Sequence, residues 1–84
     1  MAILDIKKAN KNKRCVGLRE TEKAIESEKA RKVFIARDAE DKVKKPVESK
    51  CENKGIKVEY VDTMQEIGEA CDIYRGASTA AILK

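Results

Sequence analysis

The chain has 84 residues, of which 40% are charged and 42% hydrophobic, with two Tyr, one Phe and no Trp. A chain this short has material for one hydrophobic core, so we expect a single domain over residues 1–84 with an interior of Val, Ile, Leu and Ala. Nineteen Lys and Arg against fifteen Asp and Glu give a net charge of +4, which favours polyanionic partners without naming one.

The three cysteines are odd in number and form no C-x-x-C pair, and the chain contains no His. This composition argues against structural disulfides and a zinc site, so we expect no metal and no cofactor. The first residues lack the apolar segment of a secretory signal, and no stretch approaches the ~18 apolar residues of a membrane span. The sequence therefore predicts a cytoplasmic protein without membrane contact, which we expect to be a monomer.

The first third of the chain begins with a basic segment and continues into a helix. Residues 1–10 have the apolar spacing of a short amphipathic helix or a docked arm. Arg14 to Val16 form a brief extended run, and Gly17 is a hinge between this strand and the following helix. From Leu18 onward a helical period places one side against the core. The residues of this side are Leu18, Thr21, Ala24, Ile25 and the stem of Glu28.

The middle of the chain predicts a buried strand and a helix interrupted by proline. Residues 32–36 form a continuous apolar run rich in β-branched residues, which predicts a strand buried on both faces and central in a sheet. Proline is excluded from helix interiors, so we expect one turn near Glu40 to Lys44 and then a helix starting at about Pro46. Val43, Val47 and Cys51 are expected to face the core.

The last third predicts two strands around one short helix. Gly55 ends the preceding helix, and Ile56, Val58, Tyr60 and Val61 form a strand. Thr63 and Glu66 have the spacing of a capping box, opening a helix whose Met64, Ile67, Ala70 and Cys71 point inward. Residues 78–83 fit a closing strand. Alternating strands and helices predict an α/β fold, a three-layer α/β/α sandwich with a mixed sheet of about four strands.

The chain shows no motif of a hydrolase, a nucleotide-binding enzyme or a metalloenzyme. Asp38 and Asp41 could form an acid–base pair near a strand end, but such carboxylates usually cap helices. A catalytic Cys needs an activating base, and no His is present to supply one. We therefore expect a protein that is not an enzyme.

The start of the helix after Gly17 is the most informative polar cluster. Arg19, Glu20 and Lys23 share one helix face, opposite the side that packs on the core. Gly17 permits close approach of a ligand, and free N–H groups of the first turn favour a phosphate. This combination suits a guanine edge beside its backbone, which RNA exposes only where its duplex is bent or interrupted. The alternative is a solvated helix start in which Glu20 and Lys23 form a weak pair.

Residues 16–24, Val-Gly-Leu-Arg-Glu-Thr-Glu-Lys-Ala, resemble the signature of the kink-turn-binding ribosomal protein family of the L-seven-Ae and L-thirty-e type, including its small bacterial ribosome-associated members. Residues 33–38 are similar to the family's central strand and acidic turn, and residues 67–82 to its closing helix, loop and strand. The resemblance covers about residues 13–83. It implies an RNA-binding domain whose partner is a structured RNA, ribosomal or regulatory, containing a kink-turn with tandem sheared G·A pairs.

The resemblance also implies which residues contact RNA. The helix start would face the G·A pairs and nearby phosphates, and the loop before the last strand would cover an extruded nucleotide. Within that loop Tyr74 can stack on a base, Arg75 can meet a phosphate and Ile73 can exclude water. The candidate RNA-binding residues are Gly17, Leu18, Arg19, Glu20, Lys23, Ile73, Tyr74, Arg75 and Gly76. The alternative function is a protein-interaction module of the same fold without RNA binding, suggested by the negative charge of Glu20 and Glu22.

Overall fold

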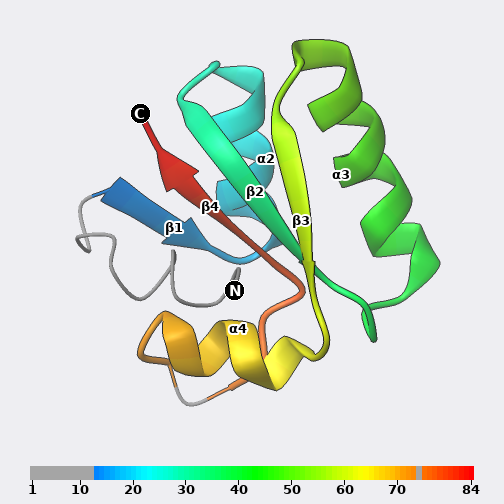
Figure 1. Ribbon diagram of the computed structural model, residues 1–84, viewed down its shortest axis with the longest axis vertical. Helices are drawn as coiled ribbons and strands as arrows, with labels where there is room; N and C mark the ends of the chain where they lie inside the picture. The colour runs from blue at the N-terminus through cyan, green and yellow to red at the C-terminus, as the bar shows by residue number, and fades with distance from the viewer. Residues whose placement is uncertain (1–12, 74) are drawn as a thin grey trace.

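The computed structural model describes residues 13–73 and 75–84. The expected helix or arm over residues 1–10 and the candidate residue Tyr74 lie outside the described residues. The elements of the described part follow in chain order and are shown in Figure 1: β1 (Arg14–Val16), α2 (Leu18–Glu26), β2 (Ala30–Ala36), α3 (Asp41–Lys54), β3 (Lys57–Val61), α4 (Met64–Ala70) and β4 (Thr79–Leu83).

The strands form one mixed sheet in the order β1-β4-β2-β3. β2 and β3 are parallel, because α3 carries the chain back between them. β4 runs antiparallel to both β2 and β1. The prediction of a mixed four-stranded sheet with residues 32–36 in a central strand is therefore confirmed.

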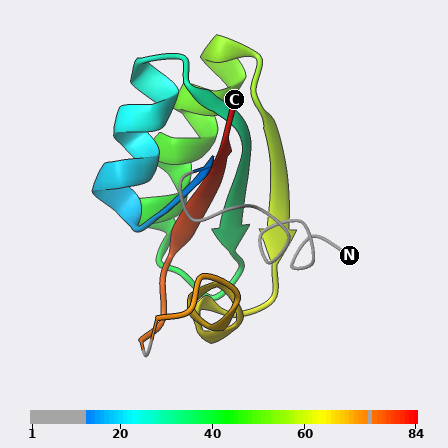
Figure 2. The ribbon, with the colours of Figure 1, turned by 90° about the vertical axis from the view of Figure 1, so that its left-hand side faces the viewer.

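Of the described helices, two cover one face of this sheet, and the third packs on part of the other. α2 and α3 lie side by side against one face, and α4 lies against the lower end of the sheet in Figure 2. Successive residues of β2 serve the two sides: Val33 and Ile35 pack with α2 and α3, whereas Phe34 and Ala36 pack with α4. All four are completely buried. This burial on both faces explains the uninterrupted apolar run and confirms the three-layer α/β/α prediction.

The expectation that Pro46 interrupts the second helix is wrong. α3 runs without a break from Asp41 to Lys54 with Pro46 inside it. Proline removes the N–H that would reach the carbonyl of Lys42, but both residues are exposed, so water can bind that carbonyl. Val47 and Cys51 are fully buried and hold the helix on the sheet. Val43 was expected to face the core as well, but it is only partly buried.

α2 buries the side predicted for it, with one exception. Thr21, Ala24 and Ile25 are buried and Leu18 is partly buried. The helix ends at Glu26, and Glu28 lies in the turn beyond it with a φ of 59° and an exposed side chain, so its predicted packing is wrong. The reason is that the chain must reverse here to enter β2.

The start of α4 is capped twice. The Thr63 hydroxyl accepts a hydrogen bond from the backbone N–H of Glu66 (3.1 Å), as the capping-box spacing predicts. The Asp38 carboxylate, from the turn after β2, accepts a second bond from the N–H of Met64 (2.8 Å). Asp38 therefore caps a helix, as expected, although the helix is distant in sequence. Among the described residues no helix is both long and apolar enough to traverse a lipid bilayer.

Candidate nucleic-acid interface

The first turn of α2 exposes backbone donors next to Gly17. Gly17 has φ 100° and ψ 157°, and its N–H donates to the carbonyl of Thr79 on β4 (2.9 Å). Its carbonyl accepts the first helical bond, from the N–H of Thr21 (3.0 Å). The intervening N–H groups of residues 18–20 therefore have no acceptor within the helix and lie at its positive end. This geometry favours an anionic ligand.

Three polar side chains surround this helix end. Arg19, Glu20 and Lys23 are exposed, while Leu18 packs partly into the core beneath them. The Nζ of Lys23 lies 3.9 Å from the nearer carboxylate oxygen of Glu20, at the limit of an ion pair. Both of these side chains are more than half exposed, so the pair is weak and its members are available to a ligand.

The next acid along α2, Glu22, is directed toward α3. Its carboxylate accepts a hydrogen bond from Lys50 Nζ (2.5 Å), which also donates to Glu26 (2.7 Å). The bonds to Glu22 and Glu26 raise the pKa of Lys50, and the bond from Lys50 lowers the pKa of Glu26. The negative charge of Glu22 is therefore compensated by Lys50 on the side of α2 that faces α3.

The loop of residues 73–76 is attached to α4. The N–H of Ile73 donates to the carbonyl of Gly68 (3.0 Å), and the N–H of Ala77 donates to the carbonyl of Met64 (3.0 Å). Ile73 is half-buried and packs against the core, whereas Arg75 and Gly76 are exposed. The loop thus exposes the cationic side chain of Arg75 next to the apolar side chain of Ile73.

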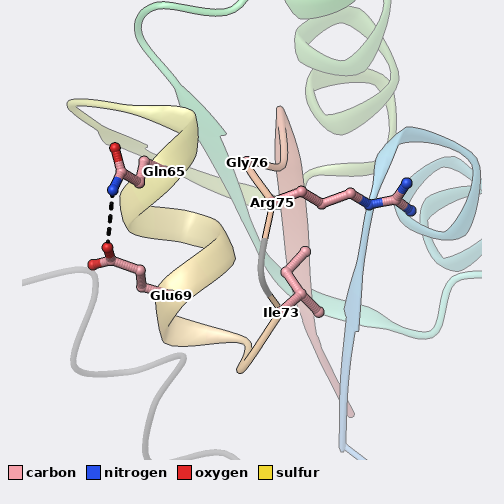
Figure 3. Close-up of a pocket in the computed structure, with 5 residues that line it drawn as sticks. All are labelled: Gln65, Glu69, Ile73, Arg75 and Gly76. Carbon is pink, nitrogen blue, oxygen red and sulfur yellow. Dashed lines mark hydrogen bonds between the residues drawn. The ribbon is translucent and has the colours of Figure 1, made fainter.

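Two hollows flank this loop. One, of about 370 Å³, lies between the loop and the outer face of α4, where the Gln65 amide donates to the Glu69 carboxylate (3.2 Å). Figure 3 shows that the Arg75 side chain extends away from these two residues. The other hollow, of about 240 Å³, lies between the loop and the β1–α2 junction. Its lining residues are Val16, Gly17, Ile73, Arg75, Gly76, Ala77 and Ser78.

The second hollow brings together the two sequence segments singled out as candidates. Gly17 from the helix start and Ile73, Arg75 and Gly76 from the loop line the same space. Arg19, Glu20 and Lys23 are exposed on the helix that begins at its rim. The prediction did not include Val16, Ala77 and Ser78. They flank the two segments, and only the pairing of β1 with β4 reveals that they line the same hollow.

A buried cation fixes the orientation of α4 beside this hollow. The Arg14 side chain, 8% exposed, donates to the carbonyl of Ala70 (3.2 Å) and forms an ion pair with Asp72 (3.2 Å). These contacts tie the end of α4 to β1, so the loop that follows begins from a defined point. A short element such as α4, with seven residues, gains most of its stability from such tertiary contacts.

The three cysteines are free and at least partly buried. Burial raises the pKa of the Cys15 and Cys71 thiols and raises that of Cys51 to about 11. A raised pKa keeps a thiol protonated and unreactive at neutral pH. Within residues 13–73 and 75–84, no group of three or more acidic, Cys or His side chains could hold a metal ion.

The chain is similar to several proteins named as RNA-binding. It is 51% identical over 69 residues to an RNA-binding protein of Caldanaerobacter subterraneus, covering 82% of this chain and 84% of that protein. It is 44% identical to an RNA-binding protein of Halalkalibacterium halodurans, with the same coverage of both chains.

Two solved structures and a family model also match the chain. A Giardia lamblia 15.5kD RNA binding protein superimposes with a TM-score of 0.81 at 27% identity, over 87% of this chain and 62% of that one. A Bacillus halodurans protein of unknown function superimposes with a TM-score of 0.79 at 22% identity, over 87% of this chain and 73% of that one, and shows the fold alone. Residues 3–84 match the model of the Ribosomal protein L7Ae/L30e/S12e/Gadd45 family. This match over nearly the whole chain and the 51% identity to a relative show that the chain belongs to this family.

Proposed function

We propose that this protein binds RNA without catalysis and recognises a kink-turn through the start of α2 and the 73–76 loop. The observation that carries the proposal is the hollow in which Gly17 meets Ile73, Arg75 and Gly76. On one side of the hollow, the N-terminus of α2 can bind a phosphate. On the other side, the apolar side chain of Ile73 and the cationic side chain of Arg75 can contact a nucleotide. The two relatives described above and the Giardia protein are named as RNA-binding, which supports RNA as the ligand.

In this proposal each side of the hollow has its own task. Arg19 and Lys23 donate to phosphates or guanine acceptors, and the Glu20 carboxylate accepts from amino or imino groups of the bases. The N–H groups at the start of α2 bind a phosphate, while Ile73 and Arg75 cover an unstacked nucleotide. A bent RNA can occupy both halves together, so binding would stabilise the kinked state of an RNA that also samples straighter forms.

The test compares two RNAs and matched variants. One RNA carries tandem G·A pairs beside a short internal loop, and in the other Watson–Crick pairs replace the G·A pairs. We expect tighter binding to the first RNA, and Glu20→Ala or Lys23→Ala should weaken this binding by ~1–3 kcal/mol. Glu52→Ala and Lys45→Ala, at exposed positions of α3, are the matched controls. Affinities unchanged in both site variants would contradict the site.

A salt titration separates this function from a protein-interaction module. Binding that neutralises phosphates weakens steeply as salt increases, because counterions are released from the RNA. A chain that has lost RNA binding would show only weak and nonselective association with both RNAs. That result would favour the alternative function.

A further inference from the structure

We infer that Gly68, in the middle of α4, is a positioning residue. It sets how closely the 73–76 loop lies to α4, and therefore the shape of the hollow that the loop shares with Gly17. Gly68 does not line that hollow itself, because it is buried beneath the loop. This inference rests on the proposed function only for its effect on RNA. The placement of the loop can be tested without RNA.

The first observation is steric. A Cβ at residue 68 would lie 2.1 Å from the carbonyl oxygen of Arg75 and 3.1 Å from its carbonyl carbon. Contacts of Cβ atoms below 3.0 Å essentially never occur, so the loop would have to retreat by roughly 1 Å. The obstructing atoms belong to the backbone and cannot rotate aside as a side chain can. Only glycine allows the loop to lie where it does.

The second observation is that hydrogen bonds hold the loop against the same surface. The Gly68 carbonyl accepts from the N–H of Ile73 (3.0 Å), and the Met64 carbonyl accepts from the N–H of Ala77 (3.0 Å). Gly76 is also close to the helix, since a Cβ at that residue would lie 3.1 Å from Cβ of Met64. The loop is therefore bound to α4 at both of its ends, with glycine at each close approach.

The consequence concerns the opposite side of the loop. Ile73, Arg75 and Gly76 line the hollow that they share with Gly17. A displacement of roughly 1 Å exceeds the ~0.5 Å within which the groups of a binding site must be held.

Glycine is also the poorest helix former after proline, so at an exposed helix position alanine would be preferred. The close loop explains why residue 68 is glycine.

The experiment compares Gly68→Ala with Gly55→Ala by amide hydrogen exchange of the free protein. Gly55 has a φ of 68° and open space around it, so alanine there strains the end of α3 without touching the loop. We expect amide exchange at Ile73 and Ala77 to be about tenfold faster or more in Gly68→Ala than in Gly55→Ala, under conditions where the two variants have the same free energy of unfolding. Equal exchange in the two variants would overturn the inference.

A double-mutant cycle gives the RNA-dependent readout. Arg75→Ala should weaken kink-turn RNA binding by about fivefold or more in the natural chain, but by less than about twofold with Gly68→Ala. An equal effect of Arg75→Ala in both backgrounds would refute a role through the loop. If the natural chain fails to bind RNA, the proposed function is wrong, while the exchange experiment still decides the placement of the loop.

Gly76→Ala serves if Gly68→Ala does not fold. Its Cβ needs a shift of only a few tenths of an ångström, so the chain should fold. We expect faster exchange at Ala77 and RNA binding weaker by about twofold to threefold. Unchanged exchange would overturn the inference in this variant too.

Discussion

Replacement of Gly17 by alanine tests how the start of α2 is built. No atom outside its chain neighbours lies within 4 Å of a Cβ placed on residue 17, so the added methyl group meets no steric obstacle. The whole cost must come from the backbone, because φ 100° with ψ 157° belongs to a region that is essentially restricted to glycine. We expect Gly17→Ala to reduce the free energy of unfolding by ~1–3 kcal/mol.

Gly55 provides a comparison that isolates the cause. Its φ of 68° and ψ of 29° lie in the left-handed helical region, which asparagine tolerates. Gly55→Asn should therefore restore much of the stability lost in Gly55→Ala, whereas Gly17→Asn should be as unstable as Gly17→Ala. The two glycines respond differently because their backbones occupy different regions of positive φ.

The assay is urea unfolding of the five chains, combined with thermal melting. For a domain of this size, the expected loss in Gly17→Ala corresponds to a fall in Tm of roughly 4–24 °C. At a temperature where the variant is folded, binding to kink-turn RNA should also weaken, because the first turn of α2 shifts. Stability within about 0.5 kcal/mol of the natural chain, a typical surface effect, would refute the backbone argument.

Three further predictions concern α3. Pro46→Ala should stabilise the protein by ~1–3 kcal/mol in urea unfolding, because it restores a helical hydrogen bond; a loss would contradict the account of this helix. Lys50→Met exposes the charge of Glu22, so RNA affinity at low salt should be about twofold to fivefold weaker than in the natural chain, and this difference should shrink at high salt. Lys54→Met is the control and should change little, because Lys54 pairs with Glu28 beyond the other end of α2 (3.9 Å). The pKa of Cys51 is raised from 9.0 to about 11, so the unfolded chain ionises first: stability is complete below pH 9 and is lost as pH rises toward 11. Cys51→Ala should reduce this alkaline loss by roughly 2 kcal/mol at pH 11, and an unchanged pH profile would count against it.

Local patterns predicted the fold where one segment determines its own structure. The apolar run at residues 32–36 indicated a strand buried on both faces, and Thr63 with Glu66 indicated a helix start. The rule about Pro46 failed because the cost of a missing hydrogen bond depends on solvent, and the carbonyl concerned lies on the exposed side of α3. Val47 and Cys51, on the buried side of α3, hold the helix against the sheet. This burial depends on the whole fold and not on the local sequence.

The candidate site shows the same limit. The sequence indicated the glycine-led start of α2, but only the resemblance to a family linked it to residues 73–76. The link depends on β4, which pairs with β1 and brings the loop beside Gly17. Gly68 was not predicted as a site residue because its close contact with Arg75 arises only after the chain has turned at the end of α4.

Of the two acidic side chains near the start of α2, Glu22 forms a close ion pair, whereas Glu20 remains accessible to a ligand. Lys50 binds Glu22 at 2.5 Å, whereas Lys23 lies 3.9 Å from Glu20, and the Glu20 side chain is 61% exposed. A pair so long and exposed can separate at little cost when RNA arrives. Lys23 could then bind a phosphate while Glu20 accepts from a base. In the proposed function, the same two residues that form a weak pair in the free protein would supply the donor and the acceptor that base recognition requires.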